Sequence, residues 1–222
     1  MRLAPELHYL AAGYEQRIPP TYFSDDVDDG ITWQPDVCPE TLALARRHRR
    51  GVIIDLGCGR ANKLTALHAA APEIDIVGVD YGPNIDWCRT NRERGTWIDA
   101  DLETVADLPL TDDLVADSVV VCSDVLEHLI DPRPTMRLIV DLLNRGCACG
   151  VLSTPARDLR VGADYIGVPR NLAHVREWTQ EEFQAFVRSF GVCIERAELT
   201  RSDDSGGGLT TQLLVVTKAA WA

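Results

Sequence analysis

The middle of the chain alternates between short apolar runs and helix-like stretches. The runs are rich in Val, Ile and Leu and end in polar or glycine residues, which is typical of buried parallel strands. Strands separated by helical segments indicate an α/β sheet. The pattern predicts strands at residues 51–56, 74–80, 96–99, 117–122 and 149–154, and helices at 61–71, 84–94, 124–130 and 134–144.

The C-terminal third follows a different pattern. Residues 155–177 have no clean period and carry glycine and proline, which predicts a long loop of the kind that usually serves function. A helix then restarts after Thr179, a good N-cap residue, with Glu182 three positions later. Residues 192–199 and 210–217 are expected to form two more strands. Their glycine-rich connection is too short for a parallel crossover, so these strands should pair antiparallel.

The first 36 residues differ from the rest because they are polar and contain prolines and several aromatic residues. We interpret residues 1–36 as a lid or cap over a single domain at 37–222. Within that domain, residues 155–177 are expected to form the substrate loop.

Composition narrows the class of protein. The chain has 222 residues, of which 45% are hydrophobic, and its net charge is −12, which disfavours nucleic acid as a partner. No apolar run approaches the ~20 residues that a membrane helix needs, and the first residues lack a signal-peptide pattern. We therefore expect a cytoplasmic protein that does not bind membranes. The sequence leaves open whether it forms a homo-oligomer.

A glycine turn after the first strand is the strongest chemical signal. Asp55 is followed by Gly57 and Gly59 at the start of the next helix. Glycine permits a tight turn and close approach of a ligand, and the helix that follows offers free N–H groups. Taken alone, this turn is equally compatible with a plain strand-to-helix connection.

Acidic residues at the ends of the next two strands favour a nucleoside-containing ligand. Asp80 ends the second strand, where its carboxylate can accept hydrogen bonds from both ribose hydroxyls. Asp101 and Leu102 follow the third strand, where an acid and an apolar side chain could hold an adenine. A dinucleotide site is disfavoured because Asn62 stands where its fingerprint needs a third glycine.

In order and spacing, these motifs resemble the class I S-adenosylmethionine-dependent methyltransferases over roughly residues 50–200. The resemblance is carried by Asp55-Leu56-Gly57-Cys58-Gly59, Val79-Asp80, Asp99-Ala100-Asp101-Leu102, and Asp117 through Val125-Leu126-Glu127-His128. It implies a Rossmann-like, doubly wound, seven-stranded sheet with helices on both faces and the last strand antiparallel.

The resemblance also implies the cofactor, S-adenosylmethionine, and the residues around it. Gly57 and Gly59 would lie beside the methionine moiety, and Asp80 would bind the ribose. Asp101 and Leu102 would flank the adenine. The remaining residues that we assign to the cofactor are Asp55, Tyr81 and Ser123.

Four further side chains are candidates for activating a methyl acceptor. Methyl transfer needs an acceptor held in line with the methyl group, and a hydroxyl acceptor must also lose its proton. Asp124, Glu127 and His128 are spaced i, i+3 and i+4, so on a helix they would share one face. His174 lies in the late loop, immediately before a helix, and could reach over the site.

These four residues admit three interpretations. His174 could be a general base, with His128 and Asp124 as further catalytic candidates. The set is also similar to the metal-binding pattern of small-RNA 2′-O-methyltransferases, which implies a divalent ion such as Mg²⁺. Two departures stand against that similarity: Asp124 replaces a glutamate, and Asn171 stands where an additional histidine is expected. Purely structural roles are the third interpretation.

We therefore predict a methyltransferase that acts on a small molecule, by O-methylation of a sugar or specialised metabolite. One alternative is a metal-assisted nucleic-acid 2′-O-methyltransferase. The other is a non-catalytic protein that binds the cofactor and serves as a partner in a complex.

Overall fold

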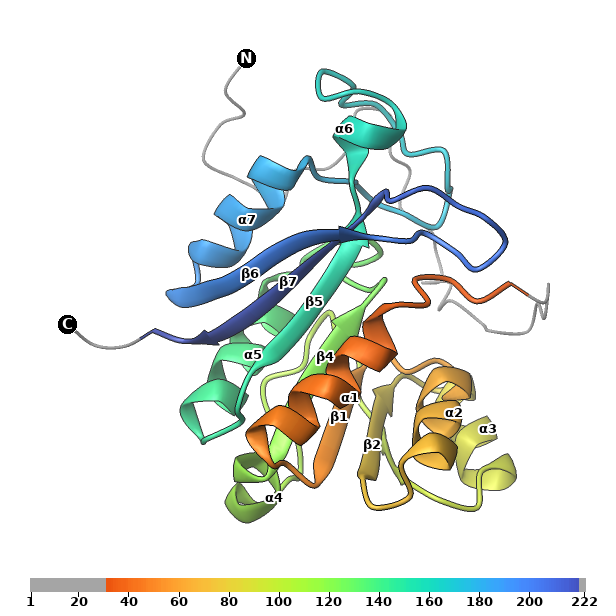
Figure 1. Ribbon diagram of the computed structural model, residues 1–222, viewed down its shortest axis with the longest axis vertical. Coiled ribbons are helices and arrows are strands. Elements are labelled where there is room, and N and C mark those ends of the chain that lie inside the picture. The colour runs from red at the N-terminus through yellow and green to blue at the C-terminus, as the bar shows by residue number, and fades with distance from the viewer. Residues whose placement is uncertain (1–30, 220–222) are drawn as a thin grey trace.

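A single seven-stranded sheet forms the centre of the computed structural model, which describes residues 31–219 (Figure 1). The strand order is β3-β2-β1-β4-β5-β7-β6. The strands are β1 (Val52–Leu56), β2 (Asp75–Asp80), β3 (Thr96–Asp99), β4 (Ser118–Ser123), β5 (Gly150–Pro155), β6 (Val192–Thr200) and β7 (Thr211–Lys218). The expected strands are all present, and no strand end is shifted by more than one residue.

Helices cover both faces of the sheet because the central strands are buried on both sides. Neighbouring side chains of β1 show this, since Ile53 and Ile54 belong to different core clusters. One face packs against α1 (Val37–His48), α2 (Asn62–Ala70) and α3 (Pro83–Asn91), and the other against α4 (Asp112–Ala116), α5 (Arg133–Asn144) and α7 (Gln180–Arg188). No helix in the described part of the chain is long and apolar enough to cross a membrane.

The last two strands pair as expected. β7 lies between β5 and β6 and is antiparallel to both, whereas the other strand pairs of the sheet are parallel. The helix before β6 begins with the expected capping box, in which Thr179 and Glu182 each accept a hydrogen bond from the other's backbone N–H.

The helix expected at residues 124–130 is absent. Asp124 has a φ of 59°, in the left-handed region, and its N–H donates to the carbonyl of Ser153 on β5. Aspartate tolerates this conformation better than most residues do. The chain therefore leaves β4 in a turn, and the three candidate side chains do not share one helical face as expected.

The topology places a binding crevice at the carboxyl ends of β1 and β4. From β1 the chain moves outward to β2 and β3, then returns to the opposite side of β1 as β4. Ligands of open α/β sheets bind at such a reversal of strand order.

The predicted lid falls largely outside the described residues. Of residues 1–36, the structure describes 31–36, which run beside the connection between β6 and β7. Gln34 N–H donates to the carbonyl of Ser202, and Trp33 forms an isolated bridge with Asp203. The guanidinium of Arg201 binds the carboxylate of Asp36.

Candidate active site

The turn after β1 requires glycine for two reasons. Gly57 and Gly59 have φ angles of 88° and 55°, where residues with a Cβ are strained. There is also no room at Gly57, because a Cβ atom there would lie 2.3 Å from Cγ2 of Val125. The turn thus places bare backbone at the carboxyl end of β1, as main-chain binding of a ligand requires.

Asp80 is fixed beside this turn by backbone hydrogen bonds. Its Oδ2 accepts from the N–H of Gly59 and its Oδ1 from the N–H of Tyr81, both at 2.7 Å. Each carboxylate oxygen can accept more than one hydrogen bond, so the group can still receive ribose hydroxyls. The position fits the expected ribose contact, which stays a prediction, and Tyr81 is partly exposed next to it.

Asp101 and Leu102, which follow β3, are already engaged in contacts within the protein. One oxygen of Asp101 accepts from the N–H of Glu103 at 2.9 Å and so closes a turn. Leu102 is buried and belongs to the core cluster on the α5 face of the sheet. Their contact with adenine stays a prediction.

Asp55 is a buried acid within β1. Burial raises its pKa to about 7, although the positive charge of Lys63 opposes this shift and Asp80 adds to it. A cationic ligand at the end of β1 would favour the ionised form of this side chain.

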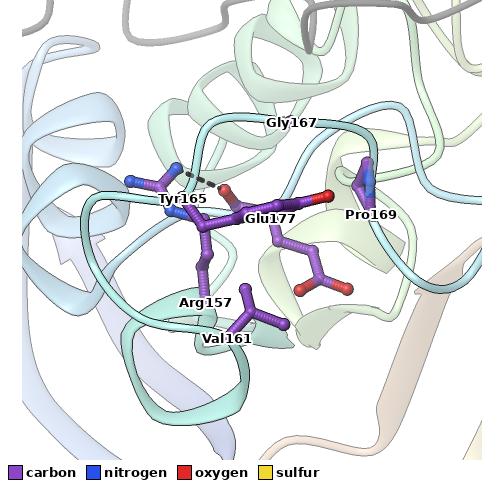
Figure 2. A pocket seen from close by; sticks show the side chains of 6 residues that line it. All are labelled: Arg157, Val161, Tyr165, Gly167, Pro169 and Glu177. Carbon is purple, nitrogen blue, oxygen red and sulfur yellow. Dashed lines mark hydrogen bonds between the residues drawn. The ribbon is translucent and has the colours of Figure 1, made fainter.

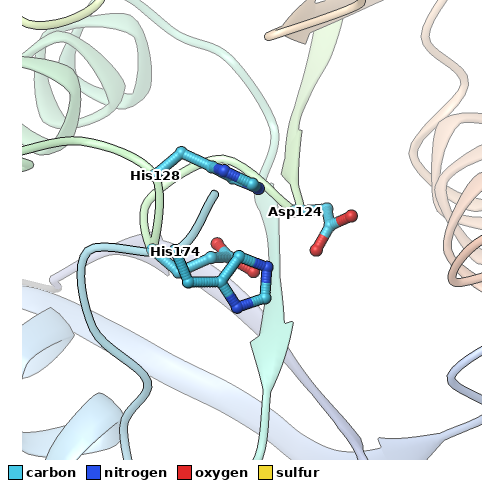
Figure 3. Close-up of side chains that lie close together, drawn as sticks. Asp124, His128 and His174 are labelled. Carbon is cyan, nitrogen blue, oxygen red and sulfur yellow. The ribbon is translucent and has the colours of Figure 1, made fainter. Parts of the chain in front are cut away.

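Asp124, Glu127, His128 and His174 come together in what we call the Asp/Glu/His cluster. Figure 3 shows Asp124, His128 and His174 within it. Each offers one potential ligand atom, and these atoms all lie within 4.8 Å of one another. The rings of His128 and His174 meet edge to face, with centroids 4.7 Å apart. The four residues were expected to act together, and the structure brings them together through a turn and a distant loop.

Glu127 is the least satisfied member of the cluster. The residue is fully buried, and among the described residues neither of its carboxylate oxygens has a hydrogen-bond partner. Burial and the nearby charge of Asp124 raise the pKa of Glu127 well above its ordinary value. For Asp124 itself, burial acts in the same direction, but the charges of His128 and His174 outweigh it and lower the pKa.

Both histidines have Nδ1 bonded to an acceptor. Nδ1 of His174 lies 2.8 Å from Oε1 of Glu177, and Nδ1 of His128 lies 3.1 Å from the carbonyl of Ala173. A carboxylate and a carbonyl only accept, so each Nδ1 carries the proton and each Nε2 keeps its lone pair when the ring is neutral. This is the orientation that metal-binding histidines usually have.

Asn171 occupies the position next to His174 Nε2. Its Nδ2 lies 3.0 Å from Nε2, and its Oδ1 accepts from the N–H of Ala173. The amide therefore donates to the lone pair of His174. Ligation of a cation by this nitrogen requires the amide to rotate away.

The buried side chain of Arg176 joins the late loop, which carries His174, to the turn after β4, which carries the other cluster residues. The guanidinium of Arg176 donates to the carbonyls of Leu129 and Ile130 at 2.6 and 2.7 Å. The N–H of Val175 donates to the carbonyl of Glu127 at 2.7 Å. These contacts fix the end of the late loop against the turn after β4. His174 therefore has a defined position relative to Glu127.

The chain matches one protein-family model, described as a methyltransferase domain, over residues 33–195. It belongs to the class I S-adenosylmethionine-dependent methyltransferases. Among curated proteins, no sequence matches it significantly.

Solved structures share the fold of this methyltransferase. The methyltransferase domain of bacterial CtHen1-C superposes with a TM-score of 0.59 at 22% identity, covering 84% of this chain and 98% of that one. Mitomycin 7-O-methyltransferase MmcR gives 0.58 at 19%, covering 83% and 54%. Human N-acetylserotonin methyltransferase, in complex with SAM, gives 0.56 at 13%, covering 82% and 52%. The methyltransferase spans about half the length of the last two.

Two residues of the site were not assigned from sequence. Glu177 lies three residues after His174, and that spacing could have revealed it. Gln34 carries no such signal, because its side-chain contacts are to Ser123, Asp124 and Ser153, about 90 to 120 residues away.

A small crevice beside Glu177 is lined by Arg157, Val161, Tyr165, Gly167, Pro169 and Glu177 (Figure 2). Arg157 donates to the carbonyl of Glu177 at 2.8 Å across one side of it. Its empty volume is about 160 Å³. This is below the ~300–1,000 Å³ of most small-molecule sites, so the crevice is too small for an acceptor.

Proposed function

We propose that this methyltransferase methylates a hydroxyl group of a small molecule, with a divalent cation bound by the Asp/Glu/His cluster. The acceptor that we favour is a sugar or specialised metabolite. The buried carboxylate of Glu127 is the observation that carries the proposal.

A buried carboxylate without any partner costs several kcal/mol unless it is neutralised or paired. Within residues 31–219, neither carboxylate oxygen of Glu127 accepts a hydrogen bond or joins an ion pair. A proton neutralises it, as its raised pKa indicates, and the carboxylate of Asp124 can then accept the O–H group. A cation at the centre of the cluster satisfies Glu127 and pairs with ionised Asp124 at the same time.

The donor set fits such an ion. Two carboxylates and two imidazoles suit a divalent transition metal such as Mn²⁺ better than Mg²⁺, which prefers oxygen ligands alone, and both imidazoles are already oriented by their Nδ1 partners. A divalent ion bound there would polarise an acceptor hydroxyl and lower its pKa.

Cofactor binding, the second part of the proposal, is supported by the turn between β1 and α2. Bound S-adenosylmethionine would supply an electrophilic methyl group, so the chain needs only to align the acceptor and exclude water. The backbone at Gly57 and Gly59 and the carboxylate of Asp80 are placed to hold this cofactor. They lie at the same edge of the sheet as the end of β4, where the cluster begins.

Charge and exposed side chains favour a small, partly apolar acceptor. The net charge of −12 repels a polyanion. Large apolar side chains are exposed along the late loop that leads to His174, at Leu159, Tyr165, Ile166 and Leu172. Such residues can contact the apolar body of an acceptor while its hydroxyl reaches the cluster.

A ribose 2′-hydroxyl of a nucleic acid is the second candidate. The cluster itself favours it, because its residues are similar to the metal-binding pattern of small-RNA 2′-O-methyltransferases. A terminal ribose and a free sugar both present adjacent hydroxyls, so the cluster alone does not separate them.

Methyl transfer from labelled S-adenosylmethionine tests the proposal. Chelator-treated protein is incubated with a panel of sugars and glycosylated metabolites or with short RNA, each with and without Mn²⁺. We expect transfer to a small molecule, restored by Mn²⁺ and abolished in Glu127→Gln. Equal turnover without the cation would contradict a role for the metal in catalysis. His174 would then be the candidate general base. Transfer to RNA alone would establish the second candidate. Binding of S-adenosylhomocysteine with no transfer to any acceptor would favour the non-catalytic partner.

A further inference from the structure

Gln34 links the strand ends to the Asp/Glu/His cluster. Its side chain is buried, and its Nε2 donates to Oδ1 of Asp124 at 2.9 Å. Its Oε1 lies 3.0 Å from the hydroxyl of Ser123 and 2.5 Å from that of Ser153. One amide therefore spans the ends of β4 and β5 and the residue that follows β4.

The orientation of this amide is fixed by chemistry. Oδ1 of Asp124 lies 2.9 Å from Nε2 of Gln34, and a carboxylate only accepts, so the NH₂ end of Gln34 must face it. The two serine hydroxyls then face the amide oxygen, to which both can donate. No other uncharged side chain of this length offers a donor at one side and an acceptor at the other.

The backbone holds Gln34 in this place at some cost. Its φ is 48°, in the left-handed region that a residue with a Cβ seldom adopts. Hydrogen bonds to the β6–β7 connection hold it in place, through Gln34 N–H to the carbonyl of Ser202 and through the Asp36–Arg201 pair two residues later. Strain of this kind persists only where the surroundings fix the conformation, and it is concentrated at functional sites.

We propose that Gln34 is a positioning residue for cation binding, which acts by holding the carboxylate of Asp124. It occupies one lone pair of Oδ1 and so limits how the carboxylate can rotate toward an ion. This inference rests on the proposed function, since it assumes that the cluster binds a divalent cation.

Mn²⁺ binding to the chelator-treated full-length protein, measured by electron paramagnetic resonance of the free ion, tests this role without any acceptor. Gln34→Met keeps the length of the side chain and removes both hydrogen-bonding groups. We expect its Mn²⁺ dissociation constant to rise 10- to 100-fold, as is typical when a partner of a metal ligand is lost. Ser153→Ala removes one hydroxyl that holds the amide, and should weaken binding by a smaller factor.

Gln212→Met is the matched control. Gln212 is another buried glutamine, but its Nε2 donates to the carbonyls of Pro155 and Trp178. It should bind Mn²⁺ as the wild type does, and all variants should bind S-adenosylhomocysteine normally. Wild-type affinity in both Gln34→Met and Ser153→Ala would overturn the role of Gln34 but leave the proposed function intact. Absence of Mn²⁺ binding by the wild type would overturn both.

Discussion

His174 Nδ1–H donates to Oε1 of Glu177, and Arg160 donates to the same carboxylate oxygen. The distances are 2.8 and 3.1 Å. Burial tends to raise the pKa of Glu177, but the hydrogen bond from His174 and the charge of Arg160 outweigh it and lower the pKa. Glu177 therefore stays ionised and fixes the tautomer in which His174 Nε2 has the lone pair.

Replacing Glu177 should weaken cation binding by the Asp/Glu/His cluster and leave cofactor binding unchanged. In Glu177→Gln the side chain keeps its shape but loses the charge that holds the tautomer, so Mn²⁺ affinity should fall 10- to 100-fold. Calorimetric titration with S-adenosylhomocysteine should give the wild-type constant. Glu181→Gln removes an equal charge from an exposed position nearby and should change neither value. Wild-type Mn²⁺ affinity in Glu177→Gln would show that the tautomer is held by other contacts.

Asp80 offers the complementary test of the cofactor site. Asp80→Asn removes a carboxylate that accepts from backbone N–H groups and, by our proposal, from ribose hydroxyls. A hydrogen bond to a charged group is worth about 1.5–3 kcal/mol, so affinity for S-adenosylhomocysteine should drop at least tenfold. Asp75→Asn, at the exposed start of the same strand, makes the same charge change and should bind normally. Equal affinities in the two variants would place the ribose elsewhere.

The sheet was predictable because its signals are local. Continuous apolar runs such as that of β4 mark strands covered on both faces, and the Thr179–Glu182 capping box lies within four residues. The glycine turn and Asp80 were visible for the same reason, since strand ends at one edge of a sheet lie close together.

The geometry of the cluster depends on contacts that sequence does not display. A helical pattern at residues 124–130 is overridden by the left-handed Asp124 and by Arg176, whose guanidinium binds the carbonyls of the turn. Gln34 reaches Ser153 across 119 positions of sequence. Only the folded sheet brings these residues together.

The buried acid on β1 should make stability depend on pH. Asp55 has an ordinary pKa of 3.8 in the unfolded chain and one of about 7 in the fold. The folded protein therefore binds the extra proton between these values, and Asp55 makes it less stable as pH rises from 4 to 8. The loss is roughly 4 kcal/mol relative to Asp55→Asn, which does not titrate. Urea unfolding of both proteins across this range checks the sign, and parallel stability curves would contradict it.

Gly57 and Val125 are in close contact, which leaves no room for a side chain at position 57. In Gly57→Ala the new Cβ would meet Cγ2 of Val125 at 2.3 Å, and the φ of 88° would be strained as well. Strain contributes about 1–2 kcal/mol and overpacking about 1–3 kcal/mol, so unfolding free energy should fall by roughly 2–5 kcal/mol. Cofactor affinity should fall too, because the turn must move.

Two further variants separate strain from collision. Gly82 also has a positive φ, 54°, but a Cβ there would meet nothing within 4 Å, so Gly82→Ala should show the cost of strain alone. Adding Val125→Ala to Gly57→Ala removes the atoms that collide. Because the two residues are in contact, their effects should be non-additive, and the double variant should be more stable than the sum of the single losses predicts. Simple additivity in urea unfolding would mean that strain, and not the collision with Val125, keeps glycine at position 57.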